Sequence, residues 1–296
     1  MKSLLRKMYN AACARPPLNW IIQRELNRLG ARDWTAHHIE RFINSDAGAA
    51  YGLDKQSRAT LVQQFQHISN TIQSGTAPVV HLMLAEAILA IPPEIKGHVV
   101  ECGVWKGASS ASLSHVCALT GRRLKVCDSF QGLPDDDEQR HTGLHTGVYG
   151  HYKEGMFKGA REEVESNIRT LGNMEACDFV EGFFEDSLKQ LTDPVAFAFL
   201  DVDLVSSTRD SLKALWPLLI EGGYIYADDA GDLDVVKVYF DDTWWQATHH
   251  CAAPGFVGSG CGLPLSPTYS AIGYTRKLGD FDAKDWKKAD FLYYPE

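Results

Sequence analysis

The spacing of apolar positions changes near residue 95. Before it, clusters such as Trp20–Ile22 and Leu61–Phe65 recur at intervals that suit amphipathic helices. From Gly97 onward, short apolar runs alternate with helical stretches, which is typical of βαβ units and a mainly parallel sheet. We therefore expect a helical cap or extension over residues 1–93 and an α/β domain over residues 94–296.

The expected elements of the second part alternate regularly. The predicted strands are His98–Cys102, Leu124–Asp128, Asp178–Glu181, Ala196–Asp201 and Tyr224–Asp228, with Tyr269–Tyr274 as a late one. The predicted helices are Ala108–Leu119, Arg161–Leu171, Phe184–Leu191, Thr208–Leu219 and Leu233–Ala247. This order predicts a doubly wound sheet, which binds ligands at the carboxyl ends of its strands. The irregular stretch of about 131–160 is predicted to be a lid loop.

Composition narrows the class of protein. The 296 residues are 45% hydrophobic and 23% charged, as in an ordinary soluble enzyme. A net charge of −9 argues against a nucleic-acid partner, because binding phosphates needs clustered Lys and Arg. We find neither a signal-peptide core nor an apolar run of membrane-spanning length, so we expect a cytoplasmic protein without a membrane partner.

The first candidate motif is a strand, a glycine-rich turn and a helix over Val99–Ser110. Gly103 and Gly107 would let the backbone approach a ligand that a Cβ would block. A dinucleotide site favours GxGxxG, but Trp105 replaces the second glycine, which favours a methionine-bearing nucleoside over a diphosphate. The alternative is a tight turn without a ligand.

The second candidate is Asp128, at the end of the second predicted strand. An acidic side chain about twenty residues after the glycine turn can accept hydrogen bonds from both ribose hydroxyls of a nucleoside. The alternative, a helix N-cap, is disfavoured because Gly132 and Pro134 would interrupt a helix that followed immediately.

The third candidate is a group of aspartates at two predicted strand ends, Asp201 with Asp203 and Asp228 with Asp229. Adjacent parallel strands would bring these carboxylates to one edge, where they repel one another unless a cation joins them. Mg²⁺ is the natural cation for such oxygen ligands. The alternative for Asp203 or Asp229 is a helix cap.

Together these motifs resemble the macrocin O-methyltransferase family, bacterial enzymes that methylate sugar hydroxyls of macrolide and aminocoumarin natural products. The resemblance covers about Ser74–Arg276 and is carried by Glu101–Gly107, Asp128–Pro134, Gly182–Leu188, and Gly222–Ile225 with Asp228 and Asp229. It implies a Rossmann-like methyltransferase fold with a doubly wound, mainly parallel, seven-stranded sheet. The chain departs from the family pattern at Val202, Val205 and Ala230, and up to about residue 70 it matches poorly.

The resemblance also implies roles for individual residues. Mg²⁺ would be bound by Asp201, Asp228 and Asp229. The donor, S-adenosylmethionine, would be bound by residues of the glycine turn, the second and third strand ends and a segment before the sheet: Ser74, Thr76, Glu101, Gly103, Val104, Gly107, Ser109, Asp128, Ser129, Gly182 and Phe183.

The expected reaction moves a methyl group from S-adenosylmethionine to a hydroxyl of a small molecule, a sugar of a natural product. Coordination to Mg²⁺ would acidify that hydroxyl, and Asp201, His141 or His145 would receive its proton. The alternatives are a nicotinamide-dependent oxidoreductase and a catalytically inactive donor-binding protein. Trp20 and the Trp244-Trp245 pair are candidate contacts of a homodimer.

Overall fold

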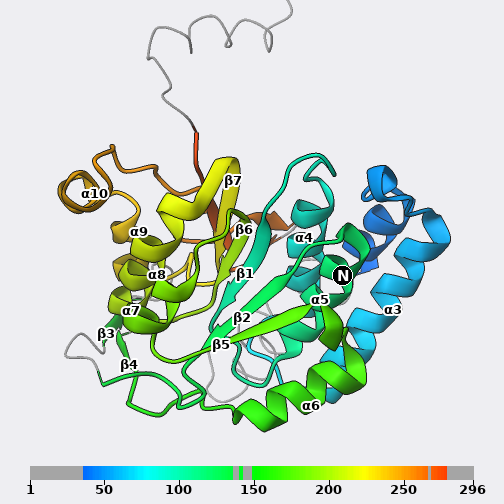
Figure 1. The fold of residues 1–296 in the computed structure, drawn as a ribbon, viewed down its shortest axis with the longest axis horizontal. Helices are drawn as coiled ribbons and strands as arrows, with labels where there is room; N and C mark the ends of the chain where they lie inside the picture. The colour runs from blue at the N-terminus through cyan, green and yellow to red at the C-terminus, as the bar shows by residue number, and fades with distance from the viewer. Residues whose placement is uncertain (1–35, 136–139, 143–148, 266–267, 279–296) are drawn as a thin grey trace, which may run out of the picture.

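The computed structural model describes residues 36–135, 140–142, 149–265 and 268–278. Across this part of the chain the main sheet has six strands in the order β10-β7-β6-β1-β2-β5 (Figure 1). Five strands run parallel, and β10 pairs antiparallel with β7. The expected doubly wound α/β class is confirmed, whereas a seventh strand is not confirmed. The strands are β1 (His98–Cys102), β2 (Leu124–Asp128), β5 (Cys177–Glu181), β6 (Val195–Leu200), β7 (Leu219–Ala227) and β10 (Gly273–Arg276).

Helices cover both faces of this sheet. One face carries α3 (Lys55–Thr71), α4 (Pro78–Leu89), α5 (Ala108–Thr120) and α6 (Arg161–Leu171), and the other carries α7 (Phe184–Ser187), α8 (Val205–Leu218), α9 (Leu233–Val238) and α10 (Asp242–His249) (Figure 1). Residues 36–44 are also helical. The shorter elements are the 3₁₀ turns η1 (Ala49–Tyr51), η2 (Met174–Ala176) and η3 (Leu188–Gln190), and the short strands β3 (Arg140–Thr142), β4 (Tyr149–His151), β8 (Pro264–Leu265) and β9 (Thr268–Tyr269).

Two hydrophobic cores lie on the two faces of the sheet. Side chains alternate along a strand, so Val99 of β1 faces one core and Val100 faces the other. Phe65 of α3 and Ile88 of α4 belong to the same core cluster as Val99. The described helices α3 and α4 therefore share one core with this face of the sheet and do not form a separate core of their own; the domain division at residues 93 and 94 stays a prediction.

The predicted helix Leu233–Ala247 is wrong, because the structure has two helices there. The carboxylate of Asp241 accepts a hydrogen bond from the Trp244 N–H at 3.1 Å and begins α10 as its N-cap. The predicted strand Tyr269–Tyr274 is likewise divided, because Ala271 has a φ of 74° between β9 and β10.

Trp245 lies in the core and does not form an exposed pair with Trp244. Its side chain is 0% exposed and packs edge-to-face on Trp216, with ring centroids 4.8 Å apart. The other dimer candidate, Trp20, lies outside the described residues, so a homodimer stays a prediction. In the described part of the chain, we find no helix long and apolar enough to cross a membrane.

Candidate functional site

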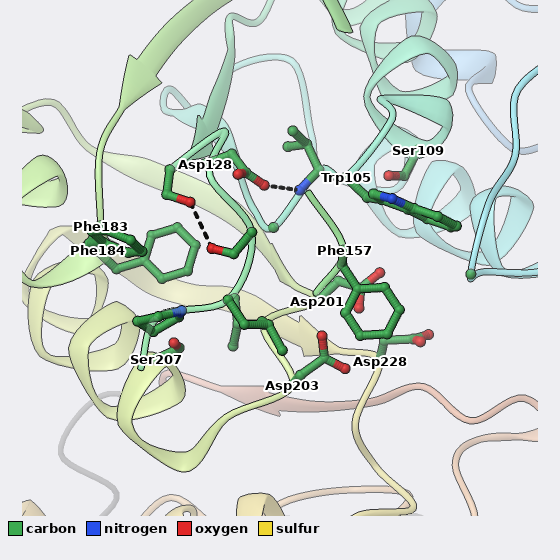
Figure 2. A pocket seen from close by; sticks show the side chains of 18 of the residues that line it. Trp105, Ser109, Asp128, Phe157, Phe183, Phe184, Asp201, Asp203, Ser207 and Asp228 are labelled. Atoms are coloured by element: carbon green, nitrogen blue, oxygen red, sulfur yellow. Dashed lines mark hydrogen bonds between the residues drawn. The ribbon is translucent and has the colours of Figure 1, made fainter. Parts of the chain in front are cut away.

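A cavity of about 620 Å³ opens at the carboxyl ends of β1, β2, β6 and β7. Of the eleven residues predicted to hold the donor, eight line it: Ser74, Thr76, Gly103, Val104, Ser109, Asp128, Ser129 and Phe183 (Figure 2). Glu101, Gly107 and Gly182 are absent from its lining. The sequence motifs therefore meet at one place, as the parallel sheet requires.

The turn after β1 approaches the end of β6 very closely. Gly103 has a φ of 83°, and a Cβ added there would lie 1.8 Å from the Asp201 carbonyl oxygen. Only glycine fits this position. Gly107 has a different role, since a Cβ there would lie 2.9 Å from Cγ1 of Val164 on α6. Gly107 thus allows α5 to pack closely against α6, and Gly103 allows the ends of β1 and β6 to meet at the cavity.

Asp128 connects the two turns that form one wall of the cavity. Its Oδ2 accepts a hydrogen bond from the Val104 N–H at 2.8 Å (Figure 2), and its Oδ1 accepts one from the Phe130 N–H at 2.7 Å. Burial raises the pKa of Asp128, and these N–H groups oppose that effect. No helix begins here, so the N-cap alternative is wrong. Each oxygen keeps lone-pair capacity for a ligand hydroxyl.

Glu101 lies behind this wall. Its side chain is 0% exposed, and neither carboxylate oxygen has a hydrogen-bond partner of good geometry. Burial raises its pKa to about 7, although the nearby Ser109 and Ser110 hydroxyls oppose this effect. Ser109, which lies beside Glu101, lines the cavity, whereas Glu101 does not.

The predicted metal ligands form an acidic group at the ends of β6 and β7. Asp201 and Asp228 line the cavity together with Asp203 (Figure 2). Asp229 does not line it but accepts a hydrogen bond from the Asp203 N–H at 3.2 Å. Burial, and then repulsion from the neighbouring carboxylates, raise the pKa of Asp201 and of Asp229. Burial, and then Asp203, raise the pKa of Asp228 to about 7.

This acidic group suits a cation chemically, although its side chains are not arranged as a complete ligand set. Within the described ranges, no three His, Cys, Asp or Glu side chains already stand so that they could hold a metal ion. Oδ1 of Asp228, however, is inaccessible to solvent and has no hydrogen-bond partner. An orphaned carboxylate oxygen among repelling carboxylates fits a divalent cation.

Asp203 belongs to the predicted aspartate group, where it had no role of its own, and Tyr152 is a site residue that the sequence interpretation did not assign. Asp203 has a φ of 60°, an uncommon conformation that Asp tolerates better than most residues, and this turns its side chain to the cavity. Tyr152 lies within hydrogen-bonding reach of Asp203, and burial, followed by the charges of Asp203 and Asp229, raises the pKa of its hydroxyl. The available signal for Asp203 was its place two residues after Asp201.

Residues 152–159, here called the lid segment, lie against the cavity mouth. The Leu133 N–H donates to the Met156 carbonyl at 2.9 Å, and the Gly155 N–H donates to the Leu133 carbonyl at 3.0 Å. The Phe157 ring packs edge-to-face on Trp105 at 5.8 Å, and both rings line the cavity. Of the predicted bases, Asp201 lines the cavity, whereas the side chain of His141 and all of His145 lie outside the described residues.

Comparisons with known proteins identify the family to which this chain is similar. The family model for macrocin-O-methyltransferase (TylF) matches residues 75–254. One relative, the 8-demethyl-8-(2,3-dimethoxy-alpha-L-rhamnosyl)-tetracenomycin-C 4'-O-methyltransferase of Streptomyces olivaceus, is 34% identical over 140 residues, which are 46% of this chain and 53% of the relative. The demethyldecarbamoylnovobiocin O-methyltransferase of Streptomyces niveus is 33% identical, with the same two shares.

The chain thus spans about half the length of the curated relatives it matches. Among solved structures, the O-methyltransferase NovP superposes with a TM-score of 0.54 at 21% identity, over 82% of this chain and 99% of that chain. This similarity supports the fold. Because the family model covers more than half of the sequence, the chain belongs to the macrocin-O-methyltransferase family.

Proposed function

We propose that this protein is an S-adenosylmethionine-dependent O-methyltransferase whose acceptor is a hydroxyl of a small molecule, a sugar of a natural product. The observation that carries the proposal is the cavity beside Gly103 and Asp128, which eight of the expected donor residues line. Family membership and the methyltransferase names of both relatives support the same activity.

The two alternative functions are less consistent with this cavity. A dinucleotide site needs backbone close to a pyrophosphate, whereas the Trp105 side chain lines the cavity at the corresponding turn. A catalytically inactive relative would be expected to have a filled acceptor cleft. Here about 620 Å³ is open between the lid segment and the strand ends, a volume in the usual range for ligand pockets.

We further propose that Asp201, Asp228 and Asp229 hold Mg²⁺. When bound, the cation would orient the acceptor hydroxyl and lower its pKa.

A carboxylate that binds a cation is a weak base, so the proton of the acceptor hydroxyl needs another acceptor. Asp203 lines the cavity beside these residues, and the Tyr152 hydroxyl, within hydrogen-bonding reach, would orient it. Asp203 is therefore a candidate general base in addition to His141 and His145.

Donor binding and methyl transfer should be measured separately in the variant Asp228→Asn. We expect S-adenosylhomocysteine binding, followed by calorimetry, to stay within about threefold of the unmodified protein, because Asp128 and Gly103 are untouched. Methylation of a panel of natural-product glycosides, followed by mass spectrometry, should fall at least about 100-fold, since metal-assisted steps depend on intact ligands.

The matched control is Asp193→Asn, which removes an exposed carboxylate just before β6, at the opposite end of the strands. It should change neither measurement. Methylation that continues unchanged in excess chelator would refute the metal proposal. Failure of the unmodified protein to bind S-adenosylhomocysteine would refute the methyltransferase proposal itself.

A further inference from the structure

Lys106 is the one Lys, Arg or His side chain among the described residues that line the cavity. It belongs to the turn between β1 and α5, and its carbonyl oxygen accepts a hydrogen bond from Nδ2 of Asn167 on α6 at 2.9 Å. The Lys106 Nζ lies 5.9 Å from the ring centroid of Trp105 and 3.6 Å from Oε1 of Glu163. Both members of this ion pair are partly exposed, so the pair contributes little free energy. A ligand anion can therefore replace Glu163 at little cost in free energy.

The donor must extend in two directions from Asp128, the proposed partner of its ribose hydroxyls. Phe183 and Phe184 lie on one side of Asp128, and Trp105 and Ser109 lie on the other (Figure 2). Aromatic rings stack on nucleobases, so the phenylalanine side suits the adenine. The methionine half must then extend along the side of Trp105 and Ser109, where the turn after β1 leads into α5.

The methionine half ends in a carboxylate and an ammonium group, and the start of α5 has partners for both. The N-cap of α5 is Gly107, which has no side chain to satisfy the first N–H groups of the helix, and Ala108 and Ser109 line the cavity. These N–H groups and Lys106 attract an anion. Glu101, whose carboxylate oxygens have no hydrogen-bond partner of good geometry, lies beside Ser109 and attracts a cation.

The other end of the cavity is unsuited to the carboxylate of the donor. The ends of β6 and β7 bring Asp201 and Asp228 there, and like charges repel one another. The proposed cation would use the same carboxylates and would face the acceptor hydroxyl. Charge and geometry therefore place the carboxylate of the donor at the same end of the cavity, beside Lys106.

We propose that the ammonium group of Lys106 binds the α-carboxylate of the donor and thereby holds the methionine half against the start of α5. This inference rests on the proposed methyltransferase function and deepens it, because it adds a donor-binding residue that the sequence interpretation did not assign. The lysine acts on one group of the donor. A donor analogue without the carboxylate, whose amine is positively charged, should therefore gain nothing from Lys106.

Two ligands test this contact by calorimetry without turnover: S-adenosylhomocysteine and its decarboxylated analogue, in which a hydrogen replaces the carboxylate. In the variant Lys106→Met, the affinity for S-adenosylhomocysteine should fall at least about tenfold, because a charge-assisted hydrogen bond is lost. The affinity for the decarboxylated analogue should stay within about twofold. The variant Lys106→Arg, which keeps the positive charge, should keep most of the affinity for S-adenosylhomocysteine.

The matched control is Lys158→Met, which removes the same charge from an exposed position on the lid segment that does not line the cavity. It should leave both affinities within about twofold, because attraction between distant exposed charges is screened by salt. Denaturant unfolding without ligand, measured on the same preparations, should show equal stability of the two Met variants within about 0.5 kcal/mol.

An equal loss of affinity for the two ligands in Lys106→Met would overturn the inference, because the lysine would then support the cavity as a whole and not bind the carboxylate. Unchanged affinity for S-adenosylhomocysteine, or a loss that Lys158→Met reproduces, would overturn it as well. If the unmodified protein does not bind S-adenosylhomocysteine, the proposed function itself fails. If it binds this ligand and only the effect of Lys106 is absent, the inference alone fails.

Discussion

Glu101 is a single carboxylate buried in the interior, and its ionisation couples the stability of the fold to pH. An ionised group without hydrogen-bond partners in the interior destabilises the folded state. The unfolded chain ionises Glu101 near its ordinary pKa of 4.5, whereas the folded protein holds it protonated up to about pH 7. The folded state therefore loses stability as the pH rises from about 4.5 to about 7, and the loss is complete above that.

The variant Glu101→Gln should therefore stabilise the protein without ligand at pH 8 and change it little at pH 4.5. The expected gain is about 2–4 kcal/mol, because one pKa unit corresponds to about 1.4 kcal/mol. Denaturant unfolding at both pH values measures it. Donor affinity should fall in the same variant, since a neutral amide does not attract the cationic donor.

A suitable control is Glu175→Gln, because Glu175 is exposed and its loss should leave stability within about 0.5 kcal/mol. A Glu101 variant that is equally stable or less stable than the unmodified protein at pH 8 would contradict this account of its burial.

At the scale of elements, glycines determine how closely segments approach the cavity. Gly159 precedes α6, and a Cβ added there would lie 1.7 Å from the Trp105 carbonyl oxygen. The φ of Gly159 is not in the left-handed region. The constraint on this position is therefore only the lack of space for a Cβ. The lid segment consequently rests on the turn that follows β1, and the Phe157 ring meets Trp105 there.

The variant Gly159→Ala should displace the lid segment while the sheet stays folded. Hydrogen exchange should increase within residues 152–159, and methylation should fall at least about tenfold, because loss of lid contacts exposes the site to water. Donor binding should change less than turnover. Both quantities are measured on one preparation.

Gly231→Ala is the matched control, because no atom lies within 4 Å of the Cβ that it would add. It should preserve both exchange and turnover. Unchanged exchange in the Gly159 variant would mean that the lid segment does not depend on this contact.

At the scale of the whole molecule, two cores hold four strand ends so that several carboxylates meet at one cavity. Their repulsion opposes folding, and the proposed cation would relieve it. Anything that binds only the folded state stabilises it in proportion to its occupancy, by about 2.7 kcal/mol at one hundred times the dissociation constant. Cation binding should therefore be visible as thermal stability, even without an acceptor.

Saturating Mg²⁺ should raise the melting temperature by a few degrees, and excess chelator should reverse the rise. NaCl at equal ionic strength is the control for screening. The effect should disappear in Asp228→Asn, whereas the variant Asp193→Asn should keep it. An equal rise of the melting temperature with NaCl would mean that ionic screening, and not a metal site, stabilises the protein.

Much of the fold could be predicted because local burial patterns encode it. The bounds of β1, β2 and α6 match the predicted ranges, since buried parallel strands and amphipathic helices have clear periods. The division between α9 and α10 was missed, because the apolar period of a helix continues through Tyr239 and Phe240. The N-cap at Asp241 is a local contact with the Trp244 N–H, and it was the signal that could have shown the division.

The sequence by itself determined the α/β class, the family and the motifs that lie at strand ends, because these depend on neighbouring residues and on a period of two or 3.6. Only the tertiary structure decided which strand ends are adjacent and which distant residues share the cavity. Asp135, Glu185 and Asp210 lie on separate segments and line one cavity, a convergence set by strand order and helix packing. Such a convergence has no local period, so no pattern along the chain could have predicted which distant residues share the cavity.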